Sequence, residues 1–413
     1  MEIDDDDDAS CCDPNECCPE ELSLEATYDK MLANDPSLTH VEIFDTDLST
    51  TTPGGGMLVL AEGLRNNTAV TYLLLQGCRV GLDGVMALGE ALSTNRALQH
   101  LALNDVSGVG DPGITLLMEG LSHHNNLQTM SLEYLDIGPF GAVAIMQFLS
   151  KNKSLFELNL NRNPLGDGGY AIAKGLMLNH CVHTLYLASC QITSPVGCAM
   201  FQALTGAEPA AARATDNGPP CCTLKFLDLS GNLLDDAVAG DLETMLRHNR
   251  TLQALAVCEN ELGPGAAGAV SAAMRSNDFL KCLNLGGNRL GLEGAQTLGE
   301  NLPHVHGLKC LTLLQNTFDH QALSCIVKGL EGNRSLVKTS IGASTDIPPI
   351  FYQAARFYAR RNEIAWRVLE DNDLPLSLWA LLLSKLASVE KEEDNVDLLF
   401  FFIRERPALF SMV

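Results

Sequence analysis

The sequence predicts an α/β fold, a right-handed solenoid with parallel strands on its concave face and helices outside. The first observation behind this prediction is a phrase, an apolar residue followed by xxLxL, that recurs between residues 38 and 341. The second is its spacing, because most copies begin about 28 residues after the previous one. One such unit cannot bury its own apolar face, so the copies must stack. They begin at Leu38, Val70, Leu98, Leu127, Leu155, Val182, Leu224, Leu252, Leu280, Leu308 and Leu336.

Each copy predicts one short strand followed by one helix. The alternating leucines of the phrase are typical of a strand that buries one face. A Gly- and Ala-rich amphipathic stretch follows and predicts the helix. Between them lies a position that favours asparagine or cysteine, where a small buried polar group can bond to the loop backbone. This position holds Cys78, Asn163, Cys190, Asn232, Asn260, Asn288 and Asn316.

Three phrases resemble a known kind of repeat. They are LKFLDLSGNLL at residues 224–234, LKCLNLGGNRLGLEGAQTLGENL at 280–302 and LFELNLNRNPLGDGGYAIAKGL at 155–176. They look like leucine-rich repeats of the long, ribonuclease-inhibitor-like type, and this resemblance implies an α/β horseshoe. Elementary spacing agrees, because strands lie about 4.8 Å apart whereas packed helices need about 8–10 Å. The strand side of the stack must therefore be the concave one.

The chain divides into three parts. Residues 1–20 are an acidic tail that we predict to be disordered. Residues 21–343 form the solenoid of about 11 repeats, opened by a capping helix at 21–32 that offers Leu22, Leu24, Tyr28, Met31 and Leu32 to the first repeat. Residues 344–413 leave the repeat period, and we expect a helical cap there, built from segments 350–369, 376–389 and 396–406.

Two segments have more than one interpretation. The tail carries Cys11, Cys12, Cys17 and Cys18, which suggest metal binding, lipidation or redox tuning, but adjacent cysteines diverge and we expect an unstructured tail without metal. The 28-residue period is interrupted by an insertion loop at 208–222, rich in proline, alanine and glycine. We favour a tolerated surface insertion there over a binding loop, although solenoids often carry specificity in such loops.

Composition narrows the function classes. The formal net charge of −24 opposes binding to nucleic acids and anionic membranes. The apolar runs are shorter than the roughly 20 residues that span a bilayer, so we expect no membrane span. The acidic start does not resemble a secretory signal, which predicts a cytoplasmic location, with the nucleus as the alternative. The fourteen cysteines follow the repeat register, so we expect reduced thiols and no disulfides.

We expect no enzyme and no cofactor. The sequence lacks a nucleophile elbow, a GxxxxGK phosphate loop, an HExxH metal motif and a Gly-rich dinucleotide loop after a strand. We interpret His123-His124 and His304-Val305-His306 as solvent-facing turns rather than metal ligands. Four arginines near the carboxy terminus predict a basic helix face that pairs with Glu363 or Glu370; docking of an acidic partner or of the acidic tail is the alternative. They are Arg356, Arg360, Arg361 and Arg367.

A protein-binding surface is predicted on the concave side. In each phrase the leucines point inward, so positions three, five and seven face solvent. At these positions the first seven repeats carry every aromatic and carboxylate residue, and the last four repeats are small and nearly neutral. Exposed aromatics in polar surroundings are typical of interface hot spots. The candidate site residues are Phe44, Tyr72, His100, Glu133, Glu157, Tyr186, Phe226 and Asp228.

The main hypothesis is a monomeric, non-enzymatic scaffold or regulator that binds a protein partner with a basic epitope. Two alternatives rest on resemblance. Residues 33–41 and 61–67 resemble the leucine-rich domain of tropomodulins, which implies actin pointed-end capping, although this chain has more repeats. Repeats with an acidic segment are similar to the activating protein for the GTPase Ran, although there the acidic segment follows the repeats. An innate-immune sensor would need a nucleotide-binding domain, and we identify none before the repeats.

Overall fold

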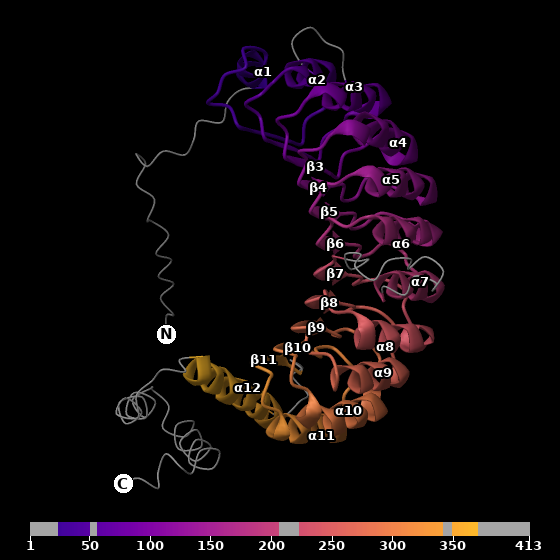
Figure 1. The fold of residues 1–413 in the computed structure, drawn as a ribbon, viewed down its shortest axis with the longest axis vertical. Helices are drawn as coiled ribbons and strands as arrows, with labels where there is room; N and C mark the ends of the chain where they lie inside the picture. The colour runs from indigo at the N-terminus through magenta and orange to yellow at the C-terminus, as the bar shows by residue number, and fades with distance from the viewer. Residues whose placement is uncertain (1–23, 50–55, 206–222, 342–348, 371–413) are drawn as a thin grey trace, which may run out of the picture.

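The computed structural model describes residues 24–49, 56–205, 223–341 and 349–370. Within these ranges strands and helices alternate, and the strands β1 to β11 form one parallel sheet in sequence order. The strands line the inner side of a curved stack and the helices its outer side (Figure 1). The α/β horseshoe with a concave parallel sheet is therefore confirmed.

The strands begin two residues after each phrase starts. They are β1 (His40–Phe44), β2 (Tyr72–Gln76), β3 (His100–Asn104), β4 (Thr129–Ser131), β5 (Glu157–Asn159), β6 (Thr184–Tyr186), β7 (Phe226–Asp228), β8 (Ala254–Ala256), β9 (Cys282–Asn284), β10 (Cys310–Thr312) and β11 (Lys338–Ser340). Neighbouring strands pair in register, with His40 opposite Tyr72 and Tyr72 opposite His100. Each repeat position therefore forms one row across the sheet.

The described helices stack in the same order along the outer side. They are α1 (Leu24–Leu32), α2 (Met57–Arg65), α3 (Gly81–Thr94), α4 (Gly110–Gly120), α5 (Pro139–Lys151), α6 (Gly169–Leu178), α7 (Ser194–Leu204), α8 (Ala239–His248), α9 (Pro264–Met274), α10 (Gly291–Asn301), α11 (His320–Gly332) and α12 (Pro349–Glu370). Short 3-10 helices flank some of them, including η1 (Leu121–His123) and η4 (Leu302–His304).

One apolar core runs through the repeats between the sheet and the helices. The phrase leucines supply its strand side, and Leu185, Leu187 and Leu227 are fully buried. Burying such a side chain stabilises the fold by roughly 1.5–3 kcal/mol. The alternation that buries these leucines turns positions three and five of the phrase to the concave surface, as the partly exposed, buried, partly exposed pattern of β6 and β7 shows.

Strands β1 to β10 are each followed by a left-handed turn at the eighth position of the repeat. Ten repeats have a positive φ there, from 48° at Asp45 to 66° at Gly231. Glycine adopts this conformation without steric cost, but most repeats use another residue, including Tyr134 and Arg162. The turn directs the chain off the sheet toward its helix and brings the next side chain, that of the Asn or Cys position, into the interior.

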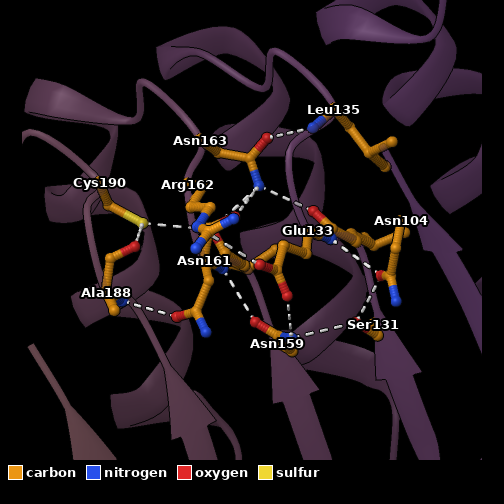
Figure 2. Close-up of polar contacts among 12 residues, drawn as sticks. Asn104, Ser131, Glu133, Leu135, Asn159, Asn161, Arg162, Asn163, Ala188 and Cys190 are labelled. Atoms are coloured by element: carbon orange, nitrogen blue, oxygen red, sulfur yellow. Dashed lines mark hydrogen bonds and ion pairs between the residues drawn. The ribbon is translucent and has the colours of Figure 1, made fainter. Parts of the chain in front are cut away.

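Buried asparagines at this Asn or Cys position bond each coil to the one before it. Asn163 is fully buried and donates from Nδ2 to the carbonyls of Leu132, at 2.7 Å, and Leu160, at 2.9 Å. Its Oδ1 accepts from the amide of Leu135 (Figure 2) and from that of Ile137. The loop backbone is thus satisfied without water. Asn232, Asn260, Asn288 and Asn316 repeat this pattern.

A second asparagine ladder ends each helix. Asn67 donates from Nδ2 to the Met31 carbonyl of the preceding coil at 2.9 Å, and its Oδ1 accepts from the amides of Ala69 and Val70. The ladder continues through the buried Asn95, Asn152, Asn179, Asn249, Asn277 and Asn333. Asn152, Asn249 and Asn333 also begin Asn-x-Ser/Thr sequons, and their burial in the ladder explains these sequons as structural.

The amino-terminal end of the core is closed by α1. The side chains of Tyr28 and Met31, on the inner face of this helix, are buried. The Tyr28 hydroxyl donates to the Gly56 carbonyl at 3.4 Å. The expectation for Leu32 was wrong, because its side chain is 56% exposed. Helical geometry turns Leu32 away from the face that Tyr28 and Met31 share.

At the other end, α12 packs against α11 and β11. Its Asn362 continues the helix-end ladder, donating to the Leu336 carbonyl at 2.9 Å. The basic face predicted for this helix was wrong at Arg361, which is buried and donates to the carbonyls of Glu331 and Asn333. Arg356 and Arg360 are exposed. The tail, the 208–222 insertion, segments 376–389 and 396–406 and the Arg367 side chain lie outside the described residues, so the three-helix cap stays a prediction.

The interpretation of His123-His124 as a solvent-facing turn was also wrong. His123 is exposed, but His124 is 1% exposed and occupies the helix-end ladder where other repeats place asparagine. Neither ring nitrogen has a hydrogen-bond partner among the described residues. Burial, and then the positive charge of Arg96, lowers the pKa of His124 to about 4.

The first ladder prediction compares two neighbouring asparagines. Changing the buried Asn67 to alanine removes three hydrogen bonds and leaves buried backbone groups unpaired, each at a cost of about 1–3 kcal/mol. We expect Asn67→Ala to lower the free energy of unfolding by about 3 kcal/mol, measured by urea denaturation. Asn66→Ala, at the exposed neighbour, should change it by less than about 0.5 kcal/mol. Equal effects would contradict the role of the ladder.

The second prediction concerns acid stability. The unfolded His124 binds a proton near pH 6.5 and the folded one only near pH 4, so the stability that this site contributes falls as the pH drops from 6.5 to 4. The shift corresponds to about 3 kcal/mol. Stability measured at pH 7 and at pH 4.5 should differ less for His124→Asn than for the wild type. His123→Asn is the exposed control and should follow the wild type; a His124→Asn variant that also did so would contradict the assignment.

Candidate protein-binding site

The eight candidate residues lie on the strands of the first seven repeats or directly after them, and seven of them form two groups rather than one patch. Tyr72 and His100 belong to β2 and β3, whereas Tyr186 and Phe226 belong to β6 and β7. Four strand steps of about 4.8 Å separate β2 from β6, roughly 19 Å along the sheet. A partner that contacts both groups must therefore extend along the concave face.

The first group is a row of rings at position three of the phrase. The rings of His40 and Tyr72 have centroids 5.2 Å apart, and those of Tyr72 and His100 are 6.0 Å apart. Nδ1 of His100 lies 2.8 Å from Oγ1 of Thr129, which fixes the imidazole. Phe44 is the last residue of β1, the strand that begins at His40, and its side chain is 51% exposed. The group presents aromatic and imidazole surfaces to the concave side.

The second group is built around two aromatic rings. Tyr186 and Phe226 have ring centroids 5.0 Å apart with planes inclined at 49°. Thr184 lies opposite Phe226 in the register and Tyr186 lies opposite Asp228, so the two rings meet diagonally across β6 and β7. The inward positions of these strands are filled by buried leucines. The two rings are therefore not required to fill the core.

Two carboxylates flank this aromatic pair. Asp228 of β7 lies directly opposite Tyr186 in the strand register. Glu157 of β5 lies opposite Thr184, which puts it diagonally across from Tyr186 on the neighbouring strand. Partial burial, followed by the negative charges of Glu157 and Asp228, raises the pKa of Tyr186. The phenol therefore stays protonated at neutral pH and can donate a hydrogen bond. Aromatic surface with flanking negative charge suits a cationic side chain.

Glu133 belongs to neither group. Its carboxylate accepts from Asn159 Nδ2 at 3.2 Å and forms an ion pair with Arg162 Nε at 3.7 Å (Figure 2). Asn159 also donates to Ser131, which in turn donates to Asn104. This network joins the third to the fifth repeat, between the two groups. Arg162 offsets the charge of Glu133, so Glu133 is a weaker candidate for contact with a cation.

The later repeats present small side chains to the concave face. Ala254, Cys282 and Cys310 continue the row that holds Phe226. Burial, and then the neighbouring Cys310 thiol, raises the pKa of Cys282 to about 11. Cys190, at the Asn or Cys position, donates its thiol to the Leu160 carbonyl, and burial raises its pKa to about 12. The described cysteines are free thiols: Cys78, Cys181, Cys190, Cys198, Cys258, Cys282, Cys310 and Cys325.

The analysis of positions three, five and seven missed the exposed Tyr134 and Phe156 and the partly buried His183. Tyr134 occupies the left-handed turn at position eight and is 59% exposed, next to Glu133. Phe156 and His183 occupy position two of neighbouring repeats and stack with centroids 4.6 Å apart. The sequence signal was an aromatic at a position that other repeats fill with polar residues or glycine. These residues widen the candidate surface beyond the strand centres.

The described part of the chain offers neither a metal-ligand cluster nor a helix that could span a membrane. It holds no cluster of three or more histidine, cysteine, aspartate or glutamate side chains arranged to ligate a metal ion. None of its helices combines the length and the apolar character that crossing a bilayer demands.

Comparison with known proteins agrees with this architecture. The family model for the leucine-rich repeat matches residues 151–171 and 276–299. The ribonuclease inhibitor of Sus scrofa is 30% identical over 227 residues, covering 54% of this chain and 46% of the inhibitor. Together with the stacked repeats and their asparagine ladders, these matches show which kind of repeat the chain contains. Its repeats are leucine-rich repeats of the ribonuclease-inhibitor-like type.

This leucine-rich repeat protein is also similar to larger proteins. The NACHT, LRR and PYD domains-containing protein 12 of Mus musculus is 32% identical over 235 residues, which cover 56% of this chain and 20% of that protein. The chain thus spans less than half the length of these curated relatives. Among solved structures, the mouse RP105/MD-1 complex matches with a TM-score of 0.44 at 16% identity, covering 76% of this chain and 47% of that one. Leiomodin-1 actin-binding site 2 matches with a TM-score of 0.32 at 15% identity, covering 42% and 92%.

Proposed function

We propose that this chain is a non-enzymatic scaffold or regulator that holds a protein partner on the concave face of β5, β6 and β7. The observation that carries the proposal is the aromatic pair Tyr186 and Phe226, whose rings meet 5.0 Å apart on a surface where the core needs neither. Glu157 and Asp228 flank the pair and favour a basic epitope. Large aromatic anchors surrounded by polar residues are the usual composition of a binding hot spot.

A rigid repeat scaffold suits this task. The asparagine ladders and the in-register strands hold neighbouring concave side chains in one arrangement, so binding costs little ordering entropy. The row of His40, Tyr72 and His100 provides a second contact for an extended partner. Protein recognition therefore rests on side chains that the repeats position but do not need.

The first functional prediction removes the aromatic anchors. Tyr186→Ala with Phe226→Ala should abolish capture of the main partner from cell lysate, because truncating one anchor costs about 2 kcal/mol or more, roughly a thirtyfold loss of affinity. Thermal stability should hardly change, since both side chains lie on the surface. Quantitative mass spectrometry of the captured proteins provides the measurement.

The matched control is Thr312→Ala with Lys338→Ala. These residues occupy the same two positions, on the same diagonal, four repeats further along the sheet. Full recovery of the partner by the control and its loss from the aromatic variant are the expected results. Recovery undiminished by the aromatic variant would refute the site. The identity of the partner also decides between the alternatives, because actin would support pointed-end capping and a small GTPase would support GTPase activation.

The second functional prediction concerns charge. Glu157→Gln with Asp228→Asn should slow association with the partner and reduce its dependence on salt, because flanking charges steer a basic epitope. Glu293→Gln with Glu300→Gln removes the same charge from exposed positions on α10 at the outer side and is the control. Association rates measured by surface plasmon resonance between 50 and 300 mM salt, about a twofold change in Debye length, test this. An unchanged salt dependence in the first variant would remove the basic epitope from the proposal.

A further inference from the structure

The helices lie on the side of the molecule opposite to the concave sheet (Figure 1). A row of equivalent positions, each exposed or partly exposed, runs along them from helix to helix. Each member precedes the helix-end ladder position by nine residues. We call it the outer row. From α2 to α6 it holds Leu58, Met86, Thr115, Val143 and Tyr170, and from α8 to α11 it holds Gly240, Gly268, Gln296 and Ser324.

The outer row changes character at the middle of the solenoid. Leu58, Met86, Val143 and Tyr170 are apolar and 41–46% exposed, whereas the later helices place small or polar residues there. The fold does not require a large side chain at this position, because a Cβ built on Gly240 or Gly268 would meet nothing within 4 Å. The fold therefore does not require a large apolar side chain at this position, although four of the five helices from α2 to α6 carry one.

Two more exposed residues widen this surface. Leu82 precedes Met86 by one helical turn on α3 and is 45% exposed, and its Cδ2 atom lies over Gly113 of the neighbouring α4. Phe140 lies one turn before Val143 on α5 and is 80% exposed. Apolar surface thus continues on both sides of Thr115. Contiguous exposed apolar surface on a folded protein commonly marks an interaction site.

An acidic row accompanies the apolar one. Glu62, Glu90 and Glu119 follow Leu58, Met86 and Thr115 by four residues, so each lies one turn further along the same helix face. Asp83 precedes Met86 by three residues. Arg65 pairs with Glu62 at 3.3 Å and with Glu90 at 3.6 Å. On α2 to α4 one arginine thus accompanies four carboxylates, which leaves this part of the face negative. On α6 the exposed Lys174 follows Tyr170 by the same four residues, so the acidic row ends before that helix.

We propose that the outer row of α2 to α6 is a second docking surface, which binds a basic amphipathic helix of a partner protein. The leucine, methionine, valine and tyrosine side chains would cover the apolar face of that helix, and Glu62, Glu90 and Glu119 would face its lysines and arginines. A second copy of this chain fits poorly, because a two-fold contact through this face would set the acidic row against itself. The site goes beyond the concave one and does not depend on it.

The test uses the full chain and a fluorescein-labelled synthetic peptide of leucine and lysine with helical amphipathic spacing. A leucine and glutamate peptide of the same pattern is the charge control. Fluorescence anisotropy should show binding of the basic peptide only. Met86→Ser, Val143→Ser and Tyr170→Ser combined should weaken it at least tenfold, whereas Gln296→Ala with Ser324→Ala, at the same positions of α10 and α11, should stay within twofold of the wild type.

Three further outcomes complete the test. Binding that is unchanged in Tyr186→Ala with Phe226→Ala supports the proposal, and binding lost in that variant would assign the peptide to the concave site and overturn it. Equal binding by the triple-serine variant, or by the acidic peptide, would also overturn it. Self-association of the wild type that disappears in the triple-serine variant, measured by analytical ultracentrifugation, would assign the row to a second copy instead. Thermal unfolding confirms that each variant is folded.

Discussion

The fold depends on satisfying backbone groups that are buried where each coil turns. Most repeats leave the sheet and return to it within about 28 residues, so their turns lie against the turns of the next coil. Amides and carbonyls in such places are costly when unpaired. One asparagine after the strand and one after the helix solve this problem, as Asn163 and Asn152 show. Each asparagine also bonds to the preceding coil, so the ladders set the register of the stack.

This register separates structural positions from free ones. The inward positions must be apolar, the ladder positions must be small and polar, and the eighth position must tolerate a left-handed conformation. The concave positions three and five and the outer row carry no such requirement. Both free surfaces differ between the halves of the solenoid, with large side chains in the earlier repeats and small ones in the later repeats. This difference within one chain is the reason that we propose recognition by the earlier half.

The sequence was sufficient to predict the fold because the phrase specifies which positions of each strand are apolar and buried. All eleven strands begin where the phrase places them, and the diagonal contact between Tyr186 and Phe226 follows from register alone. It was insufficient at two polar residues of types that normally face solvent. His124 occupies a ladder position, and Arg361 precedes the ladder residue Asn362 and donates to the carbonyls of Glu331 and Asn333, so both are buried. Tyr134 was missed because it lies at a turn, outside the strand alternation.

The central claim is that the partner contacts the aromatic pair on β6 and β7. Hydroxyl-radical footprinting of the chain, alone and in complex with its captured partner, tests it most directly, because aromatic side chains are labelled in proportion to their exposure. The account predicts that Tyr186 and Phe226 lose labelling in the complex, whereas Cys282 and Cys310 on the later strands keep theirs. Unchanged labelling of Tyr186 and Phe226 in a saturated complex would contradict it.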